Sequence, residues 1–239
     1  MKIFIYLATI LFMLPVLPLA AQVKNTDTVV RVNGRPISLS IDSVTLEKAI
    51  TKIDKDMEKK PDDPQLYSIK ATLLACQKKV DEAITAIDKA IDLNPDRAEL
   101  VGSKGIFYYL KDDTINAHCC FDKAIEMLDT RINNLSDGDY ERINNINNKY
   151  YFAYLKDQDK EKYKNSLKAE FTRIRTEIEK EGTNNLDELD DSDVKLLNRM
   201  FTKEFQDAFV EQTVNSRDIS KEGLWKLLQT IAAISIRLE

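Results

Sequence analysis

The pattern of apolar and polar residues changes once along the chain, near residue 43. From Val30 to Ile37 the two kinds of residue alternate around Asn33-Gly34, a dipeptide that favours a tight hairpin turn. Pro36 has no amide hydrogen to donate, which restricts this segment to an edge strand or a partial hairpin. We therefore predict an extended segment over residues 22–42. From Ser43 onward the apolar residues follow helical spacing, which predicts helices to the end of the chain.

The helical part carries an internal repeat. Alanines stand at positions 49, 83 and 117, which are evenly spaced. Five further pairs of similar residues have the same spacing: Ala71 with Gly105, Leu74 with Tyr108, Ile87 with Phe121, Ala90 with Ala124, and Pro61 with Pro95. A fixed period of this size is typical of helix–turn–helix arrays, in which each unit buries its apolar face against its neighbours.

The segment 64–97 resembles one unit of the tetratricopeptide repeat (TPR) family. The family has a large residue at position 4 of the repeat, small residues at 8, 20 and 27, bulky residues at 11 and 24, and proline at 32. Here those positions hold Tyr67, Ala71, Ala83, Ala90, Leu74, Ile87 and Pro95, and the next unit holds Val101, Gly105, Ala117, Ala124, Tyr108, Phe121 and, in place of proline, Asp129. Small residues are needed where two helix axes cross closely, and bulky ones fill the adjacent groove.

The resemblance implies an all-α, right-handed superhelical array of antiparallel helix pairs. Clear repeats are expected over 64–97 and 98–131, with a half repeat over 43–63 whose first helix is replaced by the extended segment. A degenerate pair is expected over 138–182, because residues 152–157 echo 107–112 at a spacing of 45. Its departure from the pattern is Lys162, which falls at the small position 20. Together these repeats would form a domain over 43–182.

In TPR proteins, one side of the first helix of each repeat lines a concave binding face. Carried over position by position, the resemblance implies that this face is lined by Gln65, Ser68, Ile69, Thr72, Glu99, Ser103, Ile106 and Tyr109. The clamp that some TPR proteins use for C-terminal carboxylates has asparagine at position 6 and lysines nearby. Ile69 and Ser103 occupy that position here, so this clamp is not expected. A peptide with apolar anchors suits the face better, although these residues could instead pack or face water.

Residues 1–21 have the layout of a cleaved secretory signal peptide. Lys2 precedes a nearly unbroken apolar stretch, and small residues lead to Gln22. No cysteine lies near the cleavage point, so we expect an exported, periplasmic protein that is not a lipoprotein and has no membrane span after cleavage. Cleavage before glutamine and a composition rich in Lys, Asn and Asp resemble exported proteins of Bacteroides-like bacteria. The net charge of −5 argues against nucleic-acid binding.

The sequence offers little for catalysis. His118 is the only histidine, and Cys76, Cys119 and Cys120 have no metal-binding spacing and lie in predicted helices, where we expect structural thiols. A Cys–His nucleophile would require a thiol with a lowered pKa. The acidic stretch 184–191 lacks the ligand spacing of a calcium loop and reads as a solvated loop before a helix. We therefore expect no enzyme activity, cofactor or metal.

The chain is predicted to end, over 183–239, in this acidic loop and a helical pair. One helix carries Val194, Leu197, Phe201, Phe205 and Phe209, and the last, from Leu224 to Ile236, is apolar nearly all round. Such a pair either folds back over the last repeat or docks on a partner. The expected function is a protein-binding adaptor, in an envelope complex for example, that uses its concave face or its C-terminal helices. The alternative is a glycan-binding module that uses Tyr108, Tyr109, Tyr150, Tyr151 and Trp225.

Overall fold

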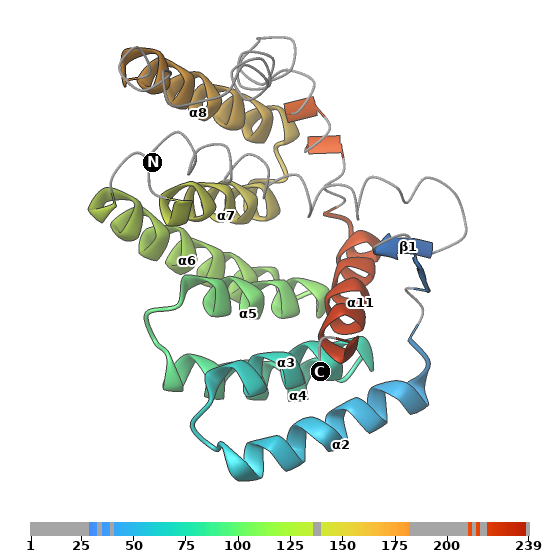
Figure 1. Cartoon of the computed structure of the whole chain (residues 1–239). Coiled ribbons are helices and arrows are strands. Elements are labelled where there is room, and N and C mark those ends of the chain that lie inside the picture. The colour runs from blue at the N-terminus through green and yellow to red at the C-terminus, as the bar shows by residue number, and fades with distance from the viewer. Residues whose placement is uncertain are drawn as a thin grey trace. The chain divides into compact units, whose positions relative to one another are not determined.

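The computed structural model describes residues 29–32, 35–38, 41–135, 140–181, 210–211, 214–215 and 219–237. Within these residues it contains eight helices and one two-stranded hairpin, so the prediction of an all-α protein is confirmed at that level (Figure 1). The chain divides into two compact units. Of the described residues, the first unit comprises 29–32, 35–38, 41–127 and 219–237, and the second comprises 128–135, 140–181, 210–211 and 214–215. The signal peptide predicted over 1–21 lies outside the described residues.

The hairpin of the first unit lies where the alternating pattern predicts it. Strands β1 (Val29–Val32) and β2 (Arg35–Ser38) pair antiparallel, with Val32 opposite Arg35 and Arg31 opposite Pro36. Two residues therefore separate the strands, which is the loop length that Asn-Gly favours, although positions 33 and 34 lie outside the described residues. In a two-stranded sheet both strands are edges, so Pro36 can be accommodated.

Five helices follow in the order α2 (Ser43–Lys59), α3 (Pro64–Cys76), α4 (Val80–Leu93), α5 (Ala98–Leu110) and α6 (Thr114–Asn134). The first residues of α3 and α5 are one repeat period apart, and so are those of α4 and α6. Asp42 caps α2 by accepting a hydrogen bond from the Thr45 amide at 2.7 Å. Each helix from α2 to α4 packs on the next along the chain (Figure 1).

The repeated small residues are buried in the two clear repeats, whereas Ala49 of the half repeat is half-buried. Ala71, Ala83, Ala90, Ala117 and Ala124 are all fully buried. Gly105, which replaces alanine in the second repeat, is backed by Phe121 of α6. A Cβ atom at Gly105 would come within 2.6 Å of Phe121 Cε1, closer than real Cβ contacts. The repeat spacing therefore marks positions where side-chain size limits how closely helices approach.

The turns after α3 and α5 have the same geometry. Lys78 and Asp112 hold equivalent positions of successive repeats, and both adopt the left-handed conformation, with φ angles of 64° and 68°. In each turn the next residue donates its amide hydrogen five residues back, from Lys79 to the Leu74 carbonyl and from Asp113 to the Tyr108 carbonyl, both at 3.0 Å. This pattern closes a helix by satisfying its last carbonyls. The repeat therefore extends to backbone conformation.

Ion pairs between helices recur with the same period. Lys70 of α3 meets Asp54 of α2 at 2.6 Å, and Lys104 of α5 meets Asp88 of α4 at 2.6 Å. Partly exposed pairs of this kind contribute about 0–1 kcal/mol each. Their main effect is to align each helix against the one that precedes it in the chain.

The second unit contains α7 (Tyr140–Asp157) and α8 (Lys160–Glu181), which pack on each other. The left-handed residue of their turn is Gln158, with φ of 55°. Tyr163 donates its amide hydrogen to the Asp159 carbonyl, four positions back. Ala83 and Ala117 donate in the same way, and each of the three residues lies five positions after the left-handed residue of its turn. The counterpart of those alanines is therefore the buried Tyr163, one residue beyond Lys162, and its ring stacks on Tyr154 at 4.9 Å.

The last helix returns to the first unit. α11 (Lys221–Arg237) packs on α3 and α5, so it folds back onto the two clear repeats (Figure 1). The acidic stretch 184–191 and the helix predicted from Val194 to Phe209 lie outside the described residues. None of the described helices combines the length and apolar composition that a membrane span requires.

Candidate functional site

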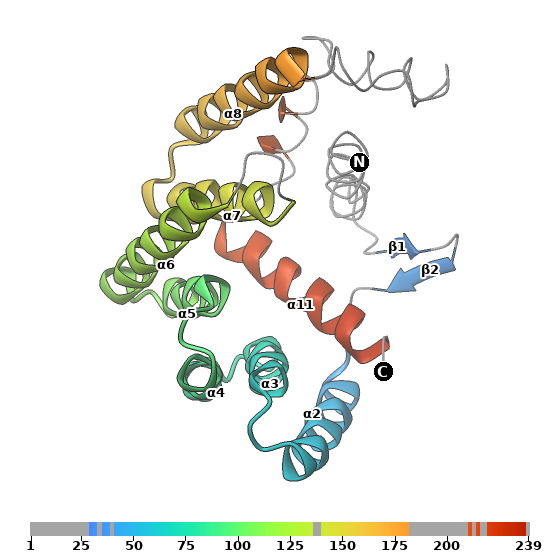
Figure 2. The ribbon, with the colours of Figure 1, turned by 60° about the vertical axis from the view of Figure 1, so that its left-hand side comes forward.

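The candidate site is the surface of the first unit on which α11 lies. Figure 2 shows α11 running across α3 and α5, with α4 on the other side of α3. At the centre of the contact Ala232 is buried against Leu46, Ile53 and Leu73. Partly buried apolar side chains surround this cluster: Ile41, Ala49, Ile50, Met57, Leu66, Ile69, Cys76 and Ile236. The segment of α11 around Ala232 therefore packs into the junction between α2 and α3.

The N-terminal half of α11 meets the two equivalent turns. The Lys221 ammonium pairs with the Asp112 carboxylate, and the Lys78 ammonium lies 3.2 Å from the centre of the Trp225 ring. The second contact is a cation–π interaction, and burial lowers the pKa of Lys78. Hereafter the α11-binding face denotes the residues of α2, α3 and the two turns that make these contacts: Leu46, Ile53, Ile69, Leu73, Lys78 and Asp112.

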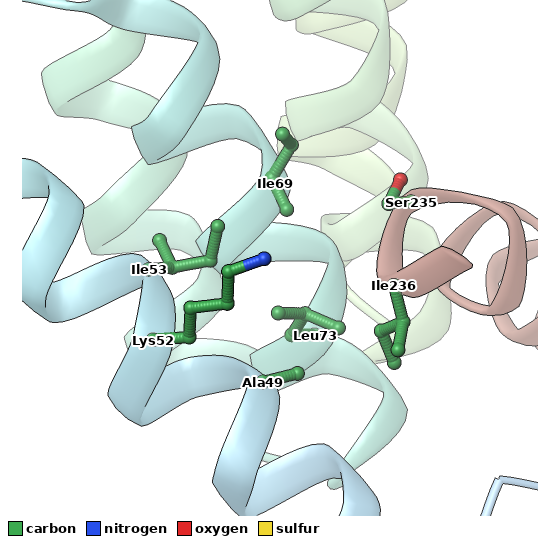
Figure 3. A pocket seen from close by; sticks show the side chains of 7 residues that line it. All are labelled: Ala49, Lys52, Ile53, Ile69, Leu73, Ser235 and Ile236. Atoms are coloured by element: carbon green, nitrogen blue, oxygen red, sulfur yellow. The ribbon is translucent and has the colours of Figure 1, made fainter. Parts of the chain in front are cut away.

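A small cavity remains at the C-terminal end of this contact. Its volume is about 40 Å³, it is lined by α2, α3 and α11, and it is open to solvent on one side. Its lining is mostly apolar: Ala49, Ile53, Ile69, Leu73 and Ile236, with Lys52 and Ser235 beside them (Figure 3). The end of α11 therefore leaves room that a bulkier apolar side chain could occupy.

The eight residues predicted to line a binding face lie on α3 and α5, with different surroundings. Gln65 is exposed, Ile106 is buried, and the other six are half-buried. The hydroxyl groups of Thr72 and Ser103 donate to carbonyls of their own helices, at 3.1 Å to Ser68 and 2.8 Å to Glu99. Ile69 is the predicted residue that packs in the cluster with α11.

Sequence reasoning missed five of the six residues of this face: Leu46, Ile53, Leu73, Lys78 and Asp112. The positions carried over from the TPR family belong to the first helix of each repeat, whereas Lys78 and Asp112 lie in the turns that follow it. Lys78 and Asp112 are one repeat period apart, and this spacing is the signal that could have identified them. The equivalence of the two positions is hard to recognise because the residues have opposite charges.

The thiols of Cys76 and Cys120 are not activated. Burial raises the pKa of Cys76 to about 11 and also raises the pKa of Cys120, whereas a nucleophilic thiol needs a lowered value. Cys119 is exposed on α6. Within the described part of the chain, no group of three or more His, Cys, Asp and Glu side chains could hold a metal ion.

The aromatic residues considered for glycan stacking lie in both units. Trp225 already has the Lys78 ammonium over its ring, and Tyr151 is buried next to Phe152, with ring centres 6.1 Å apart. Tyr150 is half-buried, and burial raises its pKa. Stacking of a sugar on Trp225 would require Lys78 to leave that ring face.

A comparison with protein-family models gives no match for this chain, and neither does a comparison with curated proteins. The resemblance to the TPR family therefore rests on the repeat pattern of the sequence and enters below as a proposal.

Proposed function

We propose that this chain is an exported, non-catalytic adaptor of the TPR type, which binds a helical segment of another protein on the α3–α5 side of its first unit. The observation that carries the proposal is the position of α11. This helix lies on the two helices that a TPR protein would turn toward its ligand. A surface that accommodates a helix of the same chain has the shape and apolar character for helix-in-groove recognition.

The repeated geometry supports the TPR-type arrangement. Helix starts, left-handed turn residues and interhelical ion pairs all recur with one period across α2 to α6. A superhelical stack arises when each repeat contacts its neighbour in the same way, because a constant small rotation then accumulates along the array. A crystal structure of the full chain would test whether the helices of the first unit follow such a curve.

The binding function can be tested with two tyrosines on α5. Tyr109 belongs to the predicted binding face, whereas Tyr108 lies next to it in sequence, 5.6 Å from the Lys104 ammonium that pairs with Asp88. We would compare the mature chain from Gln22, its Tyr109→Ala variant and its Tyr108→Ala variant as baits in envelope lysate of the host. Ile106 stays unchanged because it is buried.

The proposal expects a partner that the wild type and the Tyr108→Ala variant retain and the Tyr109→Ala variant loses. Circular dichroism must first show equal helix content in all three chains. A partner retained equally by all three would place binding elsewhere and contradict the proposed face. Failure of every bait to capture a partner would contradict the adaptor function.

A further inference from the structure

Four residues of α11 whose contacts with the α11-binding face are described above lie in one stripe of the helix, and Leu224, Leu228 and Ala233 are buried beside that stripe. Lys221 and Trp225 meet the two turns, and Ala232 and Ile236 meet the apolar cluster between α2 and α3. These four residues follow each other at intervals of four, seven and four positions. At about 100° per residue, all four lie within roughly 60° of one another around the helix axis. The stripe begins with a charge, continues with an aromatic ring and ends with a small and an aliphatic side chain.

The α11-binding face is complementary to that stripe along its length. Asp112 supplies an anion for the lysine, and Lys78 supplies a cation for the aromatic ring. Leu73 and Ile53 leave space for a small residue, and the cavity of about 40 Å³ lies beside Ile236. The face therefore specifies both the chemistry and the order of the groups on a helix that binds there.

The polar anchors of α11 are accessible to water. The side chains of Lys221 and Asp112 are 39% and 82% exposed. Lys78 is exposed as well. Exposed ion pairs hold elements together weakly. An external helix with the same stripe would replace each of these four contacts by an equivalent one, and it would also need apolar residues at the positions of Leu224 and Leu228, which are buried.

We propose that α11 is an internal occupant of this face and that the external partner is an amphipathic helix with the same stripe. That helix carries a cationic residue, an aromatic residue four positions later, a small residue after seven more and a bulky aliphatic residue after another four. The inference rests on the proposed adaptor function and adds its regulation. The partner must displace α11. Its apparent affinity is therefore its intrinsic affinity multiplied by the fraction of chains in which α11 has left the face.

The test uses a fluorescein-labelled peptide with the sequence of residues 219–237 and the full mature chain. An opened chain carries Lys221→Asp and Trp225→Ala, which remove both polar anchors of α11. The control chain carries Ile231→Ala, a loss of apolar surface on the exposed side of the same helix. Fluorescence anisotropy should show at least tenfold tighter binding to the opened chain than to the wild type and the control.

Charge reversal tests where the peptide binds. Adding Asp112→Lys to the opened chain should weaken binding about threefold at low salt, and a peptide with Lys221→Asp should recover most of the loss. Equal affinity for the wild-type, control and opened chains would overturn the proposal. Binding that Asp112→Lys does not change would also overturn it, because the peptide would then lie elsewhere.

Hydrogen exchange on the wild-type chain keeps the proposal falsifiable if the opened chain folds poorly. Excess unlabelled peptide should speed exchange in residues 221–237 and leave α3 protected, whereas unchanged exchange in α11 would overturn the proposal. Size-exclusion chromatography tests whether the α11-binding face is instead occupied by α11 of a second copy of this chain. A wild-type dimer in which α11 exchanges between copies would make a second copy of this chain the occupant and overturn an external partner.

This experiment separates the inference from the adaptor function. Peptide binding to the opened chain without any captured host protein would support displacement of α11 and contradict the adaptor function. A host protein captured through Tyr109 but bound equally by wild-type and opened chains would support the adaptor function and contradict displacement.

Discussion

Residue 105 offers the sharpest test of the packing between α5 and α6. In Gly105→Ala the new Cβ atom would lie 2.6 and 2.8 Å from two carbons of the Phe121 ring and 3.1 Å from Cys120 Cβ. The Phe121 ring is fully buried, so neighbouring side chains limit its movement. The helices must therefore separate, or the ring must leave its preferred position. At the equivalent place in the preceding repeat, Ala71 is matched by a smaller residue, Ile87, at the position of Phe121.

The expected cost follows from two opposing contributions. Overpacking of a tight core costs about 1–3 kcal/mol, and replacing glycine by alanine inside a helix returns about 1 kcal/mol. Gly105→Ala should therefore lower the free energy of unfolding by about 1 kcal/mol. Phe121→Ile alone removes ring volume and should cost about 1–2 kcal/mol. The double variant restores the Ala71–Ile87 combination and should lie within about 1 kcal/mol of the wild type.

Urea unfolding followed by tryptophan fluorescence measures these free-energy differences, and its signal comes from the first compact unit. Trp225 is the only tryptophan of the chain, and it belongs to the same compact unit as Gly105 and Phe121. The two single variants should lower the unfolding midpoint without changing the slope of the transition. A midpoint raised by Gly105→Ala, or losses that simply add in the double variant, would refute the argument from helix approach.

Three further measurements test other features. Ala83→Leu should overpack the crossing at a fully buried position and cost about 1–3 kcal/mol, and an unchanged urea midpoint would show that residue 83 is not at a crossing. Gln158→Gly should stabilise the second unit by about 0.5–1 kcal/mol, because φ of 55° is strained for glutamine; thermal melting by circular dichroism would detect the gain, and a loss would contradict it. Burial raises the pKa of Cys76 from its usual 9.0 to about 11, so the folded state keeps a proton that the unfolded state loses between those values. Stability should therefore fall by about 1–2 kcal/mol as pH rises from 9 to 11. Cys76→Ala should show a shallower decline in urea titrations across that range, and equal slopes would rule the thiol out.

The helices of the first unit were predictable because their constraints are local. Buried alanines at 83 and 117 and the turn signals between them recur within one short period, so sequence spacing alone indicates where helices begin, cross and end. The Asn-Gly turn likewise identifies the hairpin from adjacent residues. In the second unit the echo of residues 107–112 misplaced the turn by one residue, because similarity of side chains does not report which residue adopts the left-handed conformation.

The position of α11 could not be predicted in the same way. An apolar helix indicates that it must be covered, but its own pattern does not say by which element. The first unit receives α11 from a segment far along the chain, and the contact depends on complementarity between Lys221, Trp225 and two turns that look unlike in sequence. The predicted TPR face contributed Ile69 to this contact, whereas the apolar cluster and the two turns were not foreseen.

The opposite charges of Lys78 and Asp112 have a consequence for registry. A perfectly periodic array presents the same surface in every repeat, so a docked helix could slide by one repeat at little cost. Here a slide of one repeat would place Lys221 beside Lys78, two like charges in contact. Divergence at a single turn position thus removes the translational degeneracy of the array and gives the surface one allowed alignment.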